Sequence, residues 1–257
     1  MTTPGHEARM RFLKAAAASG AVLFAFAASA LADVTYVAVA ANFAEPAKEI
    51  AALFKQKTGH EAILSFGGSG PLLAQIAHDA PFQLFLSADE ARVKAAVEQG
   101  FAVKSTLFTY AIGKLVLWSR VIDLTNGEAA LKGGAFSKLA IANPNAAPYG
   151  AAAVETMKAL GVYDALKPKI VEGNSIAQTF AFVDTKNAEL GFVARSELNG
   201  VSEGTRWLVP QTLYSPIKQD AVLLKKGEND EAAKAFLEFL KGPEARAVMK
   251  KFGYALD

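Results

Sequence analysis

The 257-residue sequence contains no cysteine. This absence excludes disulfide bonds, metal sites built from thiolates and cysteine nucleophiles. It also excludes attachment to a membrane through the lipid-modified cysteine of a bacterial lipoprotein. We find no internal repeat of about twenty to fifty residues and no low-complexity segment. A folded chain that relies on packing alone is therefore expected.

Histidine is scarce as well, with three residues in the chain. Gly67-Gly68-Ser69-Gly70-Pro71 resembles a nucleophile elbow, but proline replaces its final glycine. A serine triad also needs a histidine that a third group holds against the serine, and His60 and His78 are the only candidates outside the first residues. There is no second histidine after His60-Glu61 for a zinc-protease helix, no Walker loop and no G-x-G-x-x-G. We predict that the protein is not an enzyme, and a secreted serine hydrolase using Ser69 remains a remote alternative.

Residues 1–32 have the pattern of a secretory signal peptide. Arg9, Arg11 and Lys14 precede an apolar run over 15–28, which is too short to span a bilayer, and Ala30-Leu31-Ala32 forms an A-x-A cleavage pattern. We expect cleavage near Ala32. Because no cysteine is available for a lipid anchor, a soluble protein in the periplasm is the expected product.

Charge is balanced once this leader is set aside. The chain has 27 basic and 25 acidic residues, and removing residues 1–32 leaves 24 of each. Nucleic acid and anionic membrane surfaces are therefore not expected as partners. No later apolar stretch is long enough to form a membrane-spanning helix.

Strand and helix patterns alternate along the rest of the chain. Strands are predicted at 34–41, 62–66, 82–87, 111–119, 139–142, 169–172, 190–193 and 217–224, and helices at 44–57, 71–78, 88–99, 151–160, 176–184, 231–240 and 243–252. Such alternation is typical of an α/β fold with parallel or mixed sheets flanked by helices. We expect two lobes, 33–111 plus 220–257 and 112–219, joined by two crossover segments.

Four segments share one pattern, a short apolar strand that runs into a loop of small or polar residues and then into a helix. Each helix start offers free backbone N–H groups and the positive end of a helix dipole. The loops carry Asn42, Ser69, Tyr149 and Ile176, and no Lys, Arg or His. Because open α/β sheets bind ligands beyond the carboxyl ends of their strands, these loops predict a site that holds an anion by hydrogen bonds alone.

Each of these residues also has a purely structural interpretation. Ser69 and Asn42 are suited to capping helices, although two glycines before Ser69 favour close approach to a ligand. Asn42 has two amide hydrogens, so capping and ligand binding are compatible. Tyr149 is equally suited to covering a lobe interface, and Ile176 offers only its backbone N–H. Solvated surface positions are expected for the charged side chains Glu45, Arg92, Lys104 and Arg195.

Five segments resemble the periplasmic molybdate-binding proteins of ABC importers. They are VAVAANF, SFGGSGPLLAQI, FQLFLSAD, ANPNAAPYG and ELGFVA, in that order. The resemblance spans about 34–256 and implies a two-lobed, type II-like periplasmic binding protein with a double-crossing hinge. It also implies a monomer that needs no cofactor, binds molybdate or tungstate and delivers it to the membrane permease subunits of an importer.

In that family, hydroxyls and backbone amides hold the tetrahedral anion between the lobes. The resemblance implies ligand roles for Asn42, Ser69 and the backbone of Ile176. Many members place a ligand tyrosine where this chain has Ala194, and they have a small residue at the position of Tyr149. We therefore expect the Tyr149 hydroxyl to replace the missing donor. The same fold binding sulfate or phosphate is the nearer alternative, whereas a cation receptor is disfavoured because the loops offer donors rather than metal ligands.

Overall fold

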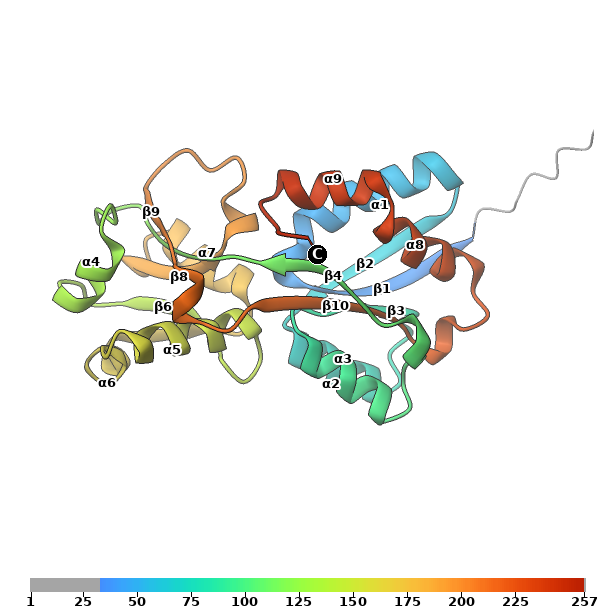
Figure 1. Cartoon of the computed structure of the whole chain (residues 1–257), viewed down its shortest axis with the longest axis horizontal. Coiled ribbons are helices and arrows are strands. Elements are labelled where there is room, and N and C mark those ends of the chain that lie inside the picture. The colour runs from blue at the N-terminus through green and yellow to red at the C-terminus, as the bar shows by residue number, and fades with distance from the viewer. Residues whose placement is uncertain (1–32, 257) are drawn as a thin grey trace, which may run out of the picture. The chain divides into compact units, whose positions relative to one another are not determined.

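The computed structural model describes residues 33–256, in which strands and helices alternate as predicted (Figure 1). The predicted signal peptide and its cleavage site lie outside the described residues. The chain begins with β1 (Val34–Ala40), the 3-10 turn η1 (Ala41–Phe43), α1 (Ala44–Thr58), β2 (Glu61–Gly67), α2 (Ser69–Ala77), β3 (Leu84–Leu86), α3 (Glu90–Glu98) and β4 (Phe108–Gly113).

A second series follows. It consists of β5 (Leu115–Ser119), α4 (Gly127–Gly133), β6 (Leu139–Ala142), α5 (Pro148–Ala159), α6 (Tyr163–Leu166), β7 (Ile170–Gly173), α7 (Ile176–Asp184), β8 (Leu190–Ala194), the 3-10 turn η4 (Arg195–Leu198) and β9 (Thr205–Leu208). The chain then returns to the first series and ends with β10 (Ile217–Leu223), α8 (Glu231–Lys241) and α9 (Pro243–Lys251).

These strands form two five-stranded sheets of the same design. The first has the order β2-β1-β3-β10-β4, and the second has the order β7-β6-β8-β5-β9. In each sheet the three strands of the βα series are parallel, and the last two strands are antiparallel to their neighbours. The predicted α/β class with mixed sheets flanked by helices is thus confirmed.

The first sheet is covered by helices on both faces, and its strands are therefore almost continuously apolar. Val37 and Val39 of β1 pack with residues of α1, α8 and α9, whereas Ala38 packs on the opposite face with residues of α2 and α3. Figure 1 shows these two groups of helices on opposite sides of the sheet. The second sheet has its own clusters on two faces. This packing fixes the carboxyl ends of the parallel strands, where the predicted loops lie.

Two chain segments connect the sheets. The first passes from β4 to β5 through Lys114, and the second passes from β9 to β10 through residues 209–216. The continuous run predicted over 111–119 is therefore two strands that belong to different sheets. The two connections contact each other, since the backbone N–H of Leu115 donates to the Tyr214 hydroxyl over 3.1 Å. β4 and β10 also pair along their length, from Phe108 to Gly113 (Figure 1).

Several helix boundaries differ from the predicted ones in a way that matters for the site. α2 begins at Ser69 rather than at residue 71, and α5 begins at Pro148 rather than at residue 151. Ser69 and Tyr149 therefore lie in the first turns of helices and not in the preceding loops. α4, α6 and β9 were not predicted. Within residues 33–256 no helix combines the length and apolar character needed to cross a membrane, and no group of acidic and histidine side chains is arranged to hold a metal ion.

Candidate anion-binding site

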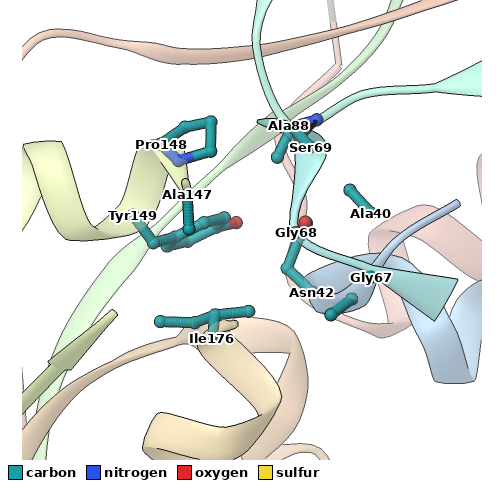
Figure 2. Close-up of a pocket in the computed structure, with 11 residues that line it drawn as sticks. Ala40, Asn42, Gly67, Gly68, Ser69, Ala88, Ala147, Pro148, Tyr149 and Ile176 are labelled. Atoms are coloured by element: carbon teal, nitrogen blue, oxygen red, sulfur yellow. Dashed lines mark hydrogen bonds between the residues drawn. The ribbon is translucent and has the colours of Figure 1, made fainter. Parts of the chain in front are cut away.

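The four predicted site residues lie together around one small pocket (Figure 2). Its eleven lining residues are Ala40, Ala41, Asn42, Gly67, Gly68, Ser69, Ala88, Ala147, Pro148, Tyr149 and Ile176. They come from the ends of β1 and β2 in the first sheet, from the turns that follow β1 and β3, and from the starts of α2, α5 and α7. The free volume is about 10 Å³, which is room for about one water molecule.

Ser69 is buried and has a hydroxyl hydrogen to donate. Its Oγ accepts a hydrogen bond from the backbone N–H of Ala88 over 3.0 Å. The N-cap of α2 is Gly68, which has no side chain, so the capping role considered for Ser69 is not the one it has. Since the N–H of Ala88 occupies only a lone pair of Oγ, the Ser69 hydrogen remains available to donate to a ligand in the pocket.

Gly68 allows the loop to approach the opposite side of the pocket. A Cβ atom there would lie 3.2 Å from the carbonyl oxygens of both Ala146 and Asn174, which come from loops of the second sheet. Gly70, in the first turn of α2, forms a direct bond across the pocket, because its N–H donates to the same Ala146 oxygen over 3.1 Å. The two glycines thus bring the backbone, rather than side chains, into contact across the pocket.

Tyr149 lines the pocket with its hydroxyl oxygen directed toward the loops of the first sheet (Figure 2). The ring is buried against Gly113, where a Cβ atom would lie only 2.1 Å from the hydroxyl oxygen. That oxygen accepts a hydrogen bond from Nε2 of Gln219 over 3.1 Å. Burial, with a smaller contribution from Tyr254, raises the pKa of the Tyr149 phenol well above its ordinary value. The phenol therefore keeps its hydrogen.

Asn42 differs from the expectation that its side chain both caps a helix and donates to a ligand. It is not a cap, because Phe43 occupies the N-cap of α1. Nδ2 lies 2.9 Å from Oε1 of Gln219 and 2.9 Å from the Tyr254 hydroxyl. Both amide hydrogens are thus donated within the protein, and the backbone of Asn42 in the η1 turn is its remaining source of donors.

Ile176 contributes its backbone, as expected. It is the first residue of α7, and the side chain of the preceding Ser175 accepts from the N–H of Gln178 over 3.2 Å. Ser175 therefore caps the helix by itself. The N–H of Ile176, in the first turn of α7, has no acceptor within the helix, and Ile176 lines the pocket.

Arg92 is not the solvated surface charge expected from the sequence. It pairs with Asp89, which also caps α3, and its guanidinium donates to the carbonyl oxygen of Asn145 over 2.6 Å. The bond crosses between the two halves of the molecule. A further crossing bond runs from Oγ of Ser196 to the backbone oxygen of Asn42 over 2.7 Å.

No charged side chain is among the residues of 33–256 that line the pocket. The adjacent acid is the partly buried Glu197, which lines a neighbouring cavity together with Asn42. Its Oε2 accepts from the N–H of Ala194 over 3.1 Å, and its Oε1 is buried without a hydrogen-bond partner. Burial raises the pKa of Glu197 to about 8, and the bond from Ala194 opposes this shift. Near neutral pH the carboxyl is therefore largely protonated.

This carboxyl makes stability depend on pH in a defined direction. Below about pH 4.5, the ordinary pKa, Glu197 is protonated in both the folded and unfolded states. As pH rises toward 8, the unfolded state releases its proton first, so the free energy of unfolding falls by up to about 1.4 kcal/mol per pH unit. Above a pKa of about 8 the loss is complete.

We expect Glu197→Gln to remove this dependence, so that the variant gains stability relative to the wild type as pH rises, by a few kcal/mol at most. Urea unfolding between about pH 5 and pH 8.5 measures this difference. Glu238→Gln changes an exposed carboxyl paired with Lys241 and is the matched control. Parallel pH curves for Glu197→Gln and the wild type would contradict the assignment.

Sequence reasoning missed the buried polar residues behind the pocket. Gln219, Tyr110, Tyr254 and Ser196 form a hydrogen-bonded network around Asn42. The signal in the sequence is limited to Lys218-Gln219-Asp220, three polar residues within β10 before its apolar end. Neither His60 nor His78 lines the pocket, and the Ser69 hydroxyl accepts a hydrogen bond from a backbone N–H.

Comparison with known proteins places these features in a family. Residues 35–255 match the family described as bacterial extracellular solute-binding protein. The chain is 52% identical over 245 residues to the Molybdate-binding protein ModA of Rhodobacter capsulatus, which covers 95% of this chain and 97% of that protein. It is 50% identical over 244 residues to the Molybdate-binding protein ModA of Azotobacter vinelandii, with 93% and 96% covered.

A solved structure shows the same arrangement. The periplasmic molybdate-binding protein of Azotobacter vinelandii superimposes with a TM-score of 0.81 at 38% sequence identity, covering 87% of this chain and 99% of that one.

Proposed function

The chain belongs to the bacterial extracellular solute-binding proteins, and we propose that the solute it binds is molybdate, with tungstate binding equally well. The five sequence segments that resemble molybdate-binding proteins and the names of the two relatives both support this ligand. The protein has a binding role in transport and no catalytic one, and it needs no cofactor.

One observation carries the proposal: three helices begin at a pocket lined by hydroxyl donors and, within 33–256, by no charged side chain. A buried dianion without a countercharge is costly unless many donors compensate it. Converging helix N-termini and charge-assisted hydrogen bonds supply that compensation. A site made only of donors rejects protonated phosphate, because the phosphate O–H would face another donor. Sulfate has the same charge and shape, so only the spacing of the donors discriminates against it.

We assign the ligand contacts to Asn42, Ser69, Tyr149 and Ile176. Ser69 and Tyr149 donate through their hydroxyls, and Ile176 donates through the N–H at the start of α7. Asn42 donates through its backbone, because its side-chain hydrogens are held inside the protein. Tyr149 replaces the donor absent at Ala194, and the buried, protonated state of its phenol supports this role.

The proposal extends to location and partners. The chain is exported to the periplasm by its leader, which is cleaved near Ala32, and it works as a monomer. Residues 33–111 plus 220–257 and residues 112–219 act as two lobes that close on the anion. Lobe closure then presents the loaded form to the membrane permease subunits of an ABC importer.

Calorimetric titration of residues 33–257 with molybdate, tungstate, sulfate and phosphate tests the function. We expect one-to-one binding of molybdate and tungstate, and binding of sulfate and phosphate at least about 100-fold weaker, equivalent to about 2.8 kcal/mol. If the protein binds sulfate or phosphate but not molybdate, the fold assignment stands and the proposed ligand is wrong. If none of the four anions binds, the alternative of a hydrolase that uses Ser69 has to be tested with an ester substrate.

A further inference from the structure

We propose that Gln219 is a positioning residue that fixes the direction of a hydrogen-bond chain, so that the Tyr149 hydroxyl can only donate into the pocket. This inference rests on the proposed function. Gln219 does not line the pocket itself. It lies fully buried on β10, at the point where the pairing with β4 shifts by one residue between Gln219 and Asp220.

The chain begins at an acceptor whose identity is fixed, the backbone carbonyl of Asn42. The Tyr254 hydroxyl donates to this oxygen over 2.8 Å, and Oγ of Ser196 donates to it over 2.7 Å. Since a phenol has one hydrogen, the Tyr254 oxygen can then only accept from the Asn42 side chain. The atom of that side chain 2.9 Å away must therefore be the nitrogen Nδ2.

The same reasoning assigns the oxygen and nitrogen of the Gln219 side-chain amide. Nδ2 of Asn42 donates, so the Gln219 atom 2.9 Å from it must be the acceptor Oε1. The Tyr110 hydroxyl lies 3.0 Å from this oxygen and 3.2 Å from the backbone oxygen of Ser87, and its one hydrogen can serve either acceptor. With Oε1 committed to Nδ2 of Asn42, the other end of the amide is Nε2, which faces Tyr149 at 3.1 Å.

The consequence is a fixed polarity at Tyr149. Because Nε2 of Gln219 donates to the phenol oxygen, the phenol hydrogen cannot point back along the chain and is directed away from Gln219, toward the pocket. An acceptor in place of Nε2 would draw this hydrogen inward and turn a lone pair toward the anion. Buried networks of this kind are sensitive to one reversed group, since each unpaired polar group is costly in a low-dielectric interior.

Gln219→Glu tests the polarity because its carboxyl can be switched by protonation. The carboxylate only accepts, so it captures the Tyr149 hydrogen, and it also adds a negative charge near the anion. The protonated acid has one donor and one acceptor, like the native amide. Burial raises the pKa of such a group, which brings its titration toward neutral pH. We expect molybdate affinity about 100-fold below wild type at about pH 8, with most of this loss recovered at about pH 5.5.

Gln219→Met removes the polarity without adding charge and allows a double-mutant cycle with Tyr149→Phe. Each single change is expected to weaken molybdate binding by about 10- to 100-fold. If Gln219 acts through the phenol, adding Gln219→Met to Tyr149→Phe costs less than about 3-fold more. Thermal unfolding of every variant checks that it is folded. Gln83→Glu places a carboxylate in a half-buried network of the first sheet, with Thr35 and Asp230, and is expected to leave affinity unchanged.

The outcomes separate this inference from the function. A wild-type protein that binds none of the anions overturns the proposed function, and the role of Gln219 with it. If the wild type binds but the losses from Gln219→Met and Tyr149→Phe simply multiply, or Gln219→Glu does not recover on acidification, the positioning role alone is wrong. Recovery together with a non-additive cycle supports it.

Discussion

Ser69→Asp is expected to abolish anion binding and leave the protein folded. The new carboxylate would face the dianion directly, and each pair of unit charges about 4 Å apart repels by about 4 kcal/mol near a protein surface. We expect at least a 1000-fold loss of molybdate affinity, about 4 kcal/mol or more. The fold tolerates the change because the N–H of Ala88 can still donate to the side chain, and the N-terminus of α2 favours negative charge. Calorimetric titration and thermal unfolding measure the two effects separately.

A pair of alanine variants controls this experiment. Ser69→Ala removes one donor and is expected to weaken binding by about 10- to 100-fold. Ser175→Ala removes a hydroxyl that caps α7 but does not line the pocket, so it is expected to cost about 1 kcal/mol of stability with affinity unchanged. Normal molybdate binding by Ser69→Asp would show that the anion binds elsewhere.

Gly150→Ala is expected to have the largest effect on folding. A Cβ atom at Gly150 would lie 2.0 Å from the carbonyl oxygen of Ala142 and 3.0 Å from the carbonyl carbon of Asn143. Both are backbone atoms at the end of β6, so no side-chain rotation relieves the clash. We expect a loss of about 3 kcal/mol, at the upper end for an overpacked site. Affinity should fall as well, because relief requires α5 to shift and carry Tyr149 with it.

Urea unfolding measures this loss, and Gly133→Ala is the matched control. Gly133 ends α4 with nothing within 4 Å of the position of its Cβ, so alanine is expected to raise stability by up to about 1 kcal/mol. Similar stabilities for the two variants would mean that α5 does not pack as closely on β6 as the structure shows.

The alternation of elements could be predicted because each βα unit has a local pattern. Val34–Ala40 is nearly all small or branched apolar residues, and the helix after it repeats apolar residues at a helical period. The break at Lys114 could not be predicted, because Leu115–Ser119 has the same β-rich composition as the strand before it. Which sheet a strand joins is decided by distant partners: β4 pairs with β10, and β5 pairs with β8 and β9.

The site was predictable to the same extent. Asn42, Ser69, Tyr149 and Ile176 each follow a strand, so the fold itself brings them to one pocket. The bonds that orient them were not predictable, since Asn42 meets partners 177 and 212 residues away in the chain. The sequence shows which donors are available, but their direction depends on long-range contacts.

Under the proposed function, the direct bonds between the two halves of the molecule set how quickly the anion is exchanged. The pocket lies between loops that are joined by Gly70 to Ala146, by Arg92 to Asn145 and by Ser196 to Asn42. A bound anion leaves only when these bonds break, so its dwell time is limited by the opening of the protein and not by the strength of the anion contacts alone. Changes at the rim, such as at Arg92, therefore act on the lifetime of the complex while leaving the donors around the anion in place.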